Sequence, residues 1–183
     1  EKLSPIQLLD ACRSAEAVAC GSPHGDNVAP ALLGGIVFLP QGSEVEPISL
    51  PVPSGLYFAL AHPDVEVRTE QARAVLPAEV PLGKAVFNAG QLGHLISSLY
   101  ADDLEGLGKA MEDGIVTPLR SSLIPGFSEV CRDALGAGAL GVGISGSGPT
   151  VFAMTRGEST ANDVAKAMQE AFHRLNVEAT SWS

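Results

Sequence analysis

Polar side chains that can hold a small ligand are concentrated in the stretch HGDN, residues 24–27. His24, Asp26 and Asn27 lie within four positions there, and each can orient a hydroxyl or a charged group through hydrogen bonds. The same composition is typical of a turn stabilised by Asx hydrogen bonds. Taken alone, the stretch favours the turn, and a ligand-binding corner is the alternative.

Three charged residues are further candidates. Arg73 in TEQAR and Arg120 in TPLRSSLIPG each lie near an expected helix end, in a chain with only 11 Lys and Arg residues. A surface role is the usual one for such arginines. Glu16 lies late in the first expected helix, where it is either an exposed solubilising residue or a carboxylate directed at a metal ion.

The stretch GISGSGPT, residues 143–150, places three glycines and two serines between two apolar runs. A turn with so few side chains can direct several backbone N–H groups at an oxyanion. It can equally be a structural hairpin, and the spacing does not separate the two.

Two nucleotide-binding motifs are excluded by their context. Residues 136–141 and 141–146 both match GxGxxG, but a dinucleotide site needs a strand before the glycines and a helix after them. The first match follows an expected helix, and the second leads through Pro149 into a strand. The LGKA sequences at 82–85 and 107–110 lack both the upstream glycine and the Ser or Thr of a P-loop.

The elements that position these residues can be predicted from caps and periodicity. Ser4 and Gln7 form a capping box for a helix that runs to about Ala19. A polar loop over 21–30 then leads into an apolar strand within 32–40.

The remaining elements follow a proline- and glycine-rich stretch over 40–55. We expect a strand over 56–67, a short helix capped by Thr69, and three or four helices between Leu82 and Leu135. Those helices are expected to break at ADD, at the glycines of LEGLGK and at IPG. Strands at ALGVGI and TVFAMT, a helix capped by Thr160 and a strand at NVEATSW complete an α+β fold with an antiparallel sheet and helices on one face.

Composition limits the partners. The net charge of -10 opposes binding to nucleic acid or anionic lipid. No apolar run approaches the roughly 20 residues of a membrane span, and no secretory signal pattern is present. Three cysteines without CxxC spacing indicate reduced core thiols. We therefore expect a cytoplasmic protein that binds neither nucleic acid nor membrane.

Four blocks together resemble the homoserine kinase family of the GHMP small-molecule kinase superfamily. They are GSPHGDNVAPALLGG, TEQARAVLP, PLRSSLIPGF and GVGISGSGPTVFA. The resemblance implies phosphorylation of the side-chain hydroxyl of L-homoserine in threonine biosynthesis, with ATP and Mg²⁺ as cofactors and a homodimer as a potential assembly. It also implies a remnant of a ribosomal S5 domain 2-like domain over residues 1–47, followed by a ferredoxin-like GHMP kinase C-terminal domain over 48–183.

The resemblance also implies roles for the candidate residues. Arg73 and Arg120 would grip the substrate carboxylate. His24, Asp26 and Asn27 would line the pocket near the amino and hydroxyl groups, and Asn27 would orient the reacting hydroxyl.

Two further sites follow from the same resemblance. Glu16 would hold Mg²⁺. The glycine loop, with Ser145, Gly146, Ser147 and Gly148, would brace the phosphate-binding loop of the cofactor site.

The sequence departs from the family pattern in three ways. The N-terminal strand region that supplies further substrate contacts, including an acidic partner for the amino group, is absent. The family's PxxxGLGSSAA-like loop, which wraps the ATP phosphates, is absent, and Gly25 stands where relatives often have Pro or Ala. We therefore expect the C-terminal part of such a kinase, with roughly the first hundred residues missing and no turnover by itself. The alternatives are a kinase for another small alcohol and a non-catalytic, ligand-sensing relative.

Overall fold

The computed structural model describes residues 4–20, 25–40 and 46–183. The chain divides into two compact units, 1–52 and 53–183. The first unit extends to Val52, because the strand at Ile48–Leu50 pairs with another strand of that unit. Within the described residues, no helix has the length and apolar character needed to cross a membrane.

The first unit contains α1 (Pro5–Cys20), α2 (Val28–Leu33), β1 (Ile36–Phe38) and β2 (Ile48–Leu50). The predicted capping box is confirmed, because Gln7 N–H donates to Ser4 Oγ at 3.2 Å and Ser4 N–H donates to Gln7 Oε1 at 2.9 Å. Helix α2 was not predicted. It tolerates Pro30 because this residue lies in the first turn, where an N–H has no intrahelical acceptor.

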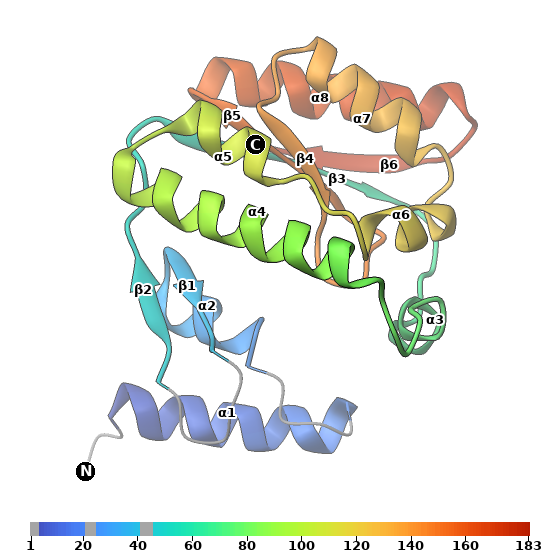
Figure 1. The fold of residues 1–183 in the computed structure, drawn as a ribbon. Helices are drawn as coiled ribbons and strands as arrows, with labels where there is room; N and C mark the ends of the chain where they lie inside the picture. Colours follow the sequence, from blue (N-terminus) through green and yellow to red (C-terminus); the bar gives the residue numbers. More distant parts are fainter. Residues whose placement is uncertain (1–3, 21–24, 41–45) are drawn as a thin grey trace. The chain divides into compact units, whose positions relative to one another are not determined.

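The second unit is built on an antiparallel sheet with the order β4-β5-β3-β6 (Figure 1). Its strands are β3 (Leu56–Pro63), β4 (Gly141–Ile144), β5 (Val151–Arg156) and β6 (Ala179–Trp182). Its helices are α3 (Thr69–Ala74), α4 (Leu82–Ala101), α5 (Leu104–Ala110), α6 (Thr117–Arg120), α7 (Phe127–Gly136) and α8 (Glu158–Arg174). A 3₁₀ turn, η1 (Ser121–Leu123), follows α6. The predicted β-loop-β-α-β order at the C-terminus is confirmed.

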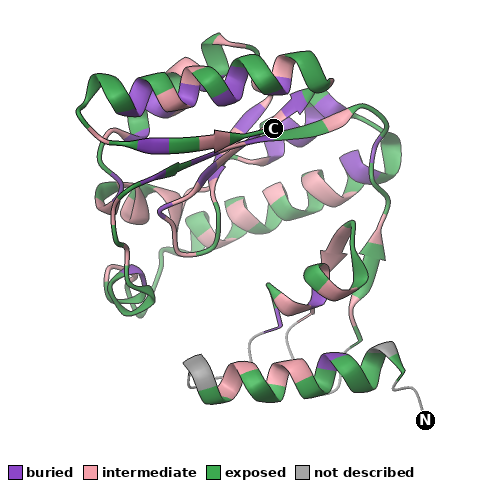
Figure 2. Cartoon of the chain, turned by 180° about the vertical axis from the view of Figure 1, so that it is seen from behind, coloured by how far each residue is buried: buried purple, intermediate pink, exposed green. Residues whose placement is uncertain are grey.

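The core lies between one face of this sheet and helices α7 and α8 (Figure 2). Alternate residues of β5 point into it, since Val151, Ala153 and Thr155 are fully buried. Helix α8 contributes Met168 and Phe172, both fully buried. This two-layer packing fixes the positions of β4 and β5, and the glycine loop connects these two strands.

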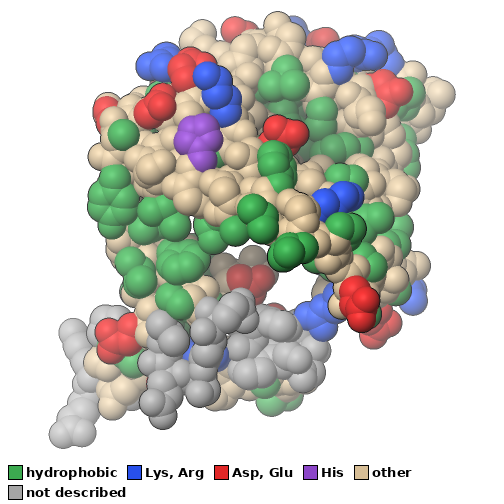
Figure 3. All heavy atoms as spheres, in the orientation of Figure 1, with side chains coloured by type: hydrophobic (Ala, Val, Ile, Leu, Met, Phe, Trp, Pro, Cys, Tyr) green, Lys and Arg blue, Asp and Glu red, His purple; other side chains and the backbone are tan. Residues whose placement is uncertain are grey.

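Helix α4 lies on the other side of the sheet from α7 and α8 (Figures 1 and 2), so the prediction of helices on one face was wrong. Only Ser98 and Leu99 of α4 are buried. Hydrophobic side chains gather over this helix on the surface (Figure 3), and its exposed large ones are Leu82, Val86, Phe87, Leu92 and Tyr100.

Three local predictions are corrected. The glycines of LEGLGK lie inside α5 rather than breaking it. Gly108 is needed there because a Cβ atom would collide with the backbone carbonyl of Leu140. Helix α8 begins at Glu158 after Gly157, two residues before the predicted Thr160 cap. Helix α3 is preceded by Arg68, whose N–H donates to Gln71 Oε1 at 3.3 Å, so Thr69 is not its cap.

Two of the three cysteines have described side chains, and both Cys12 and Cys131 are free thiols. Burial raises the pKa of Cys131 to about 11. This thiol therefore stays protonated at neutral pH, as expected for a core residue.

Candidate functional site

Arg120 connects three parts of the second unit. It is the last residue of α6. Its Nε–H donates to the carbonyl oxygen of Ala72 in α3 at 3.1 Å, and Nη1 donates to the carbonyl oxygen of Gly146 at 2.8 Å. The structure thus joins both arginine blocks and the glycine loop at one side chain.

The guanidinium of Arg120 contacts neutral groups in the described part of the chain. In the part of the chain that the structure describes, no ion pair within 4.0 Å includes this guanidinium. Two of its five N–H groups are taken by carbonyls, which hold the planar fork in one orientation. The remaining N–H groups of Nη1 and Nη2 can therefore bind a carboxylate.

Arg73 lies in the last turn of α3, directly after Ala72. It is exposed, while Ala72 is fully buried. The bond from Arg120 to the Ala72 carbonyl therefore anchors the helix that carries Arg73.

The glycine loop joins β4 to β5. Ser145 N–H donates to the Thr150 carbonyl at 2.9 Å, and Gly148 N–H donates to the Ser145 carbonyl at 2.9 Å. Gly146 has φ 58° and Gly148 has φ 86°, a region that side chains other than glycine rarely adopt. The predicted hairpin is therefore real, and its tightness depends on these glycines.

The same loop leaves two donors available. Among the described residues, no acceptor faces the N–H groups of Gly146 and Ser147. Gly146 is exposed and Ser147 is half-buried. The hairpin interpretation is confirmed. Binding of an oxyanion by these N–H groups stays a prediction, with which their exposure is compatible.

The first unit carries the other candidates. Asn27 directly precedes α2 and makes no side-chain capping bond. It lines an open cavity of about 420 Å³ with Cys12, Val28, Ala31 and Leu32. Asp26 is exposed beside Asn27, and His24 lies outside the described residues.

Glu16 is half-buried on α1. The described residues contain no group of three or more His, Cys, Asp or Glu side chains that could hold a metal ion. Mg²⁺ in phosphoryl-transfer sites is often held by one or two carboxylates, with phosphate oxygens and water as its other ligands. A single carboxylate is therefore compatible with Mg²⁺ and is not a self-sufficient metal site.

Two groups in the second unit were not predicted from the sequence. His62 Nδ1 lies 2.8 Å from Thr150 Oγ1 at the end of the glycine loop. Asp113 lies just before α6 and binds Asn88 and the backbone there. Partial burial alone would raise the pKa of Asp113, but the Asn88 amide and backbone N–H donors lower it from 3.8 to about 2. The only signal in the sequence was an acidic residue four positions before Thr117.

Comparison with known proteins defines the class first. Residues 95–174 match the family described as GHMP kinases C terminal. The match lies within the second unit and agrees with the expected α+β fold. A mevalonate kinase from L. major shares the fold, with a TM-score of 0.73 at 14% identity over 92% of this chain and 55% of its own.

The more similar relatives are homoserine kinases. The one from Chlorobium phaeobacteroides is 45% identical over 93% of this chain and 53% of its own length. The crystal structure of homoserine kinase from Cytophaga hutchinsonii has a TM-score of 0.96 at 42% identity, over 99% of this chain and 57% of that one. The resemblance stated above is confirmed, and the chain spans about half the length of the relatives it matches.

Proposed function

We propose that this chain supplies the substrate-binding half of an ATP-dependent kinase that phosphorylates the side-chain hydroxyl of L-homoserine to O-phospho-L-homoserine, in threonine biosynthesis. The observation that carries the proposal is the pair of bonds from Arg120 to the carbonyls of Ala72 and Gly146. They bring together three of the four blocks that resemble homoserine kinases. The identity of 45% to a homoserine kinase supports the same substrate.

Homoserine carries both of its charges at one end and reacts at the other. A guanidinium that binds the carboxylate through two parallel N–H bonds therefore also aims the hydroxyl. Arg120 is oriented for this role by its two carbonyl contacts. Arg73 is the second member of the proposed carboxylate clamp.

Phosphoryl transfer depends on positioning and on charge stabilisation more than on covalent chemistry by the protein. We assign Asn27 to orient the hydroxyl, and His24 and Asp26 to the neighbourhood of the substrate amino group. The N–H groups of Gly146 and Ser147 would bind an anionic oxygen or support the phosphate-binding loop.

ATP would supply the transferred phosphoryl group, and Mg²⁺ would neutralise charge on the phosphate oxygens. Glu16 is the residue proposed to hold the metal. Since this sequence has no loop of the type that wraps the ATP phosphates, we expect the chain alone not to turn over homoserine.

A substrate panel tests the proposal. The protein as encoded by its gene is incubated with ATP, Mg²⁺ and either homoserine, shikimate, mevalonate or galactose, and ADP release is measured. Homoserine should give a kcat/KM at least about 100-fold above the other alcohols. None of these carries both a carboxylate and an ammonium group, so at least one charged contact of the site stays unmade with each of them. Equal or greater turnover of another alcohol would assign the protein to a different substrate.

Calorimetry separates an enzyme from a ligand-sensing relative. The protein as encoded is titrated with homoserine and with a non-hydrolysable ATP analogue. A kinase should bind both ligands, whereas binding of homoserine without nucleotide, together with absent ADP release, would indicate a sensor.

A further inference from the structure

Asp113 is the most heavily hydrogen-bonded carboxylate in the described part of the chain. It lies in the connection between α5 and α6. Its Oδ1 accepts from Asn88 Nδ2 at 2.7 Å, from Ile115 N–H at 2.9 Å and from Val116 N–H at 3.1 Å. Its Oδ2 accepts from Val116 N–H at 3.1 Å and from Thr117 N–H at 2.6 Å.

Asn88 lies on α4 and binds the same connection through both polar atoms of its side-chain amide. While its amide nitrogen donates to Asp113, its Oδ1 accepts from Gly114 N–H at 3.0 Å. The two side chains therefore fix the backbone of residues 113–117 against a 20-residue helix.

Helix α6 depends on this arrangement. It is four residues long, and a helix of that length is not stable by its own hydrogen bonds. Its first N–H groups have no intrahelical acceptor, and Asp113 accepts from those of Val116 and Thr117. The Arg120 N–H in turn donates to the Val116 carbonyl at 2.9 Å.

We propose that Asp113, held by Asn88, is a positioning residue for Arg120, which sets the direction of the guanidinium toward the substrate carboxylate. The inference rests on the proposed function. A short path of hydrogen bonds carries it, from Asn88 to Asp113, to the first turn of α6, and to Arg120 at its end. A shift of about 1 Å in a group that orients a substrate can cost two orders of magnitude in rate.

The carboxylate keeps this role over the whole neutral range. Its pKa is about 2, since the Asn88 amide and the backbone donors outweigh partial burial. Asp113 is thus ionised throughout the neutral pH range, so its hydrogen bonds to the start of α6 do not change with pH there.

A matched control exists in the same unit. Asp103 precedes α5 and accepts from Gly106 N–H at 2.9 Å. Helix α5 ends at Ala110 and carries no arginine. Asp103→Asn therefore removes the same charge at a comparable helix start without touching the path to Arg120, while its Oδ1 can still accept from Gly106 N–H.

The test compares Asp113→Asn, Asn88→Ala and Asp103→Asn in the protein as encoded. We measure KM and kcat for homoserine, KM for ATP and the thermal unfolding midpoint. Asp113→Asn should raise the homoserine KM at least about tenfold, Asn88→Ala should raise it less, and the ATP KM should stay within about twofold for both. Asp103→Asn should leave the homoserine KM within about twofold and change the unfolding midpoint little, because Asn is about as good an N-cap as Asp.

A spectroscopic readout is independent of activity. The Arg120 Nε–H resonance, identified by its loss in Arg120→Lys, should exchange slowly with solvent because it donates to Ala72. It should exchange fast in Asp113→Asn and stay slow in Asp103→Asn. If the wild type fails to use homoserine, the proposed function fails, and this resonance alone decides the positioning role.

The inference is overturned if Asp113→Asn keeps both a slow Nε–H exchange and a normal homoserine KM. It is also overturned if Asp103→Asn reproduces the change in KM, since loss of a negative charge at any helix start of this unit then explains both. Should Asp113→Asn fail to fold, the same criteria apply to Asn88→Ala, which retains the backbone bonds of Asp113.

Discussion

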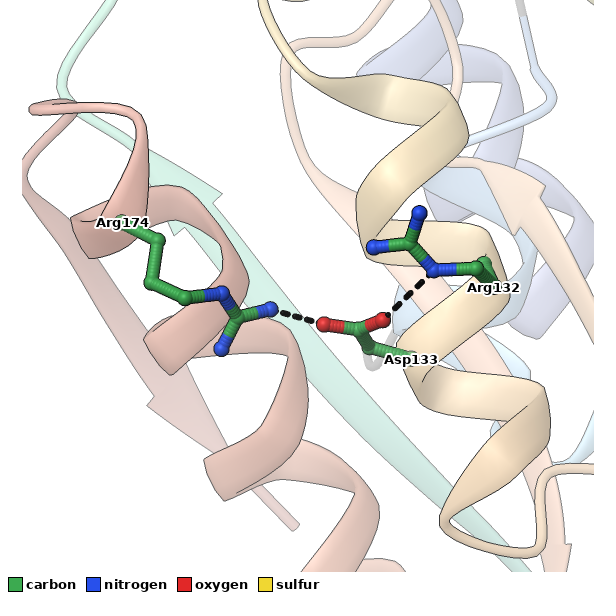
Figure 4. A network of polar contacts seen from close by, with 3 residues as sticks. All are labelled: Arg132, Asp133 and Arg174. Carbon is green, nitrogen blue, oxygen red and sulfur yellow. Dashed lines mark hydrogen bonds and ion pairs between the residues drawn. The ribbon is translucent and has the colours of Figure 1, made fainter.

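Two arginine networks in the second unit differ in what their guanidinium groups contact. Arg132 and Arg174 both pair with Asp133, which joins α7 to the last turn of α8 (Figure 4). Arg120 contacts two backbone carbonyls and, among the described residues, no carboxylate. A carbonyl oxygen carries only a partial negative charge, so the two carbonyls do not neutralise Arg120. The charge of Arg174, in contrast, is balanced by the carboxylate of Asp133.

The contrast separates a structural arginine from one prepared for a ligand. The Asp133 network links two helices, and its arginine side chains are 69% and 55% exposed. Arg120 is half-buried and fixed by neutral groups. Among the described residues no ion pair within 4.0 Å includes Arg120. In a chain with net charge -10, such an oriented guanidinium supports the proposed contact with an anionic substrate group.

Arg120→Ala should have the largest effect on activity of all the variants in this comparison. Loss of charge-assisted hydrogen bonds, worth about 1.5–3 kcal/mol each, should lower kcat/KM for homoserine about tenfold to a hundredfold or more. The KM for ATP should hardly change. The control is Arg132→Ala, whose steady-state kinetics should match the wild type. Unaltered kinetics in Arg120→Ala would remove the carboxylate clamp from the proposal.

Arg120→Lys should lower kcat/KM less than Arg120→Ala does. It separates the contribution of the positive charge from that of the planar guanidinium. Lysine keeps the charge, but its ammonium group lacks the planar set of donors. It cannot donate to the Ala72 and Gly146 carbonyls and bind a carboxylate through two parallel bonds at the same time. We expect a loss of about tenfold in kcat/KM, mainly through KM, since one bidentate contact becomes a point contact. Kinetics equal to those of Arg120→Ala would show that the fork, rather than the charge, supplies all of the binding.

Asp113 extends the comparison to carboxylates, because its partners are neutral N–H groups whereas those of Asp133 are cationic. Its pKa is about 2 in the folded chain, against an ordinary value of 3.8. The folded state therefore binds fewer protons than the unfolded state in this interval. The stability from Asp113 is present above about pH 4 and lost as pH falls through about 2.

Urea unfolding at several pH values checks this prediction. The gap in free energy of unfolding between the wild type and Asp113→Asn should be constant from about pH 5 to 7 and should narrow as pH falls toward 2. Other carboxylates contribute equally to both proteins and cancel in the difference. A gap that widens on acidification would contradict the assigned pKa direction.

The sequence predicted the elements with strong local signals. The capping box of Ser4 and Gln7 and the C-terminal β-loop-β-α-β order were both correct. Helix α2 was missed because Gly and Pro surround six residues of weak periodicity. The glycines of α5 were misinterpreted because their role is close approach to Leu140, a contact 32 positions away in the sequence.

The candidate site likewise contains residues that the sequence indicates and residues that only the fold identifies. Arg120 and the glycine loop were named as candidates through the blocks that resemble homoserine kinases, whereas residue type alone favoured a surface role for Arg120. Asp113 and Asn88 could not be predicted, because an Asp followed by Gly is typical of any turn. Only the fold shows that Asn88, 25 positions earlier, donates to that carboxylate.

Arg174→Ala should give the smallest effect, on stability alone. Its pair with Asp133 is exposed on the arginine side, and such pairs contribute about 0.2–1 kcal/mol. The free energy of unfolding should fall by no more than that, and the difference from the wild type should shrink in about 1 M NaCl, where the Debye length is about 3 Å. Arg120→Ala should keep its kinetic defect in the same salt relative to the wild type, because a half-buried contact is screened less. A loss of homoserine turnover in Arg174→Ala as large as in Arg120→Ala would show that the two networks do not differ in function.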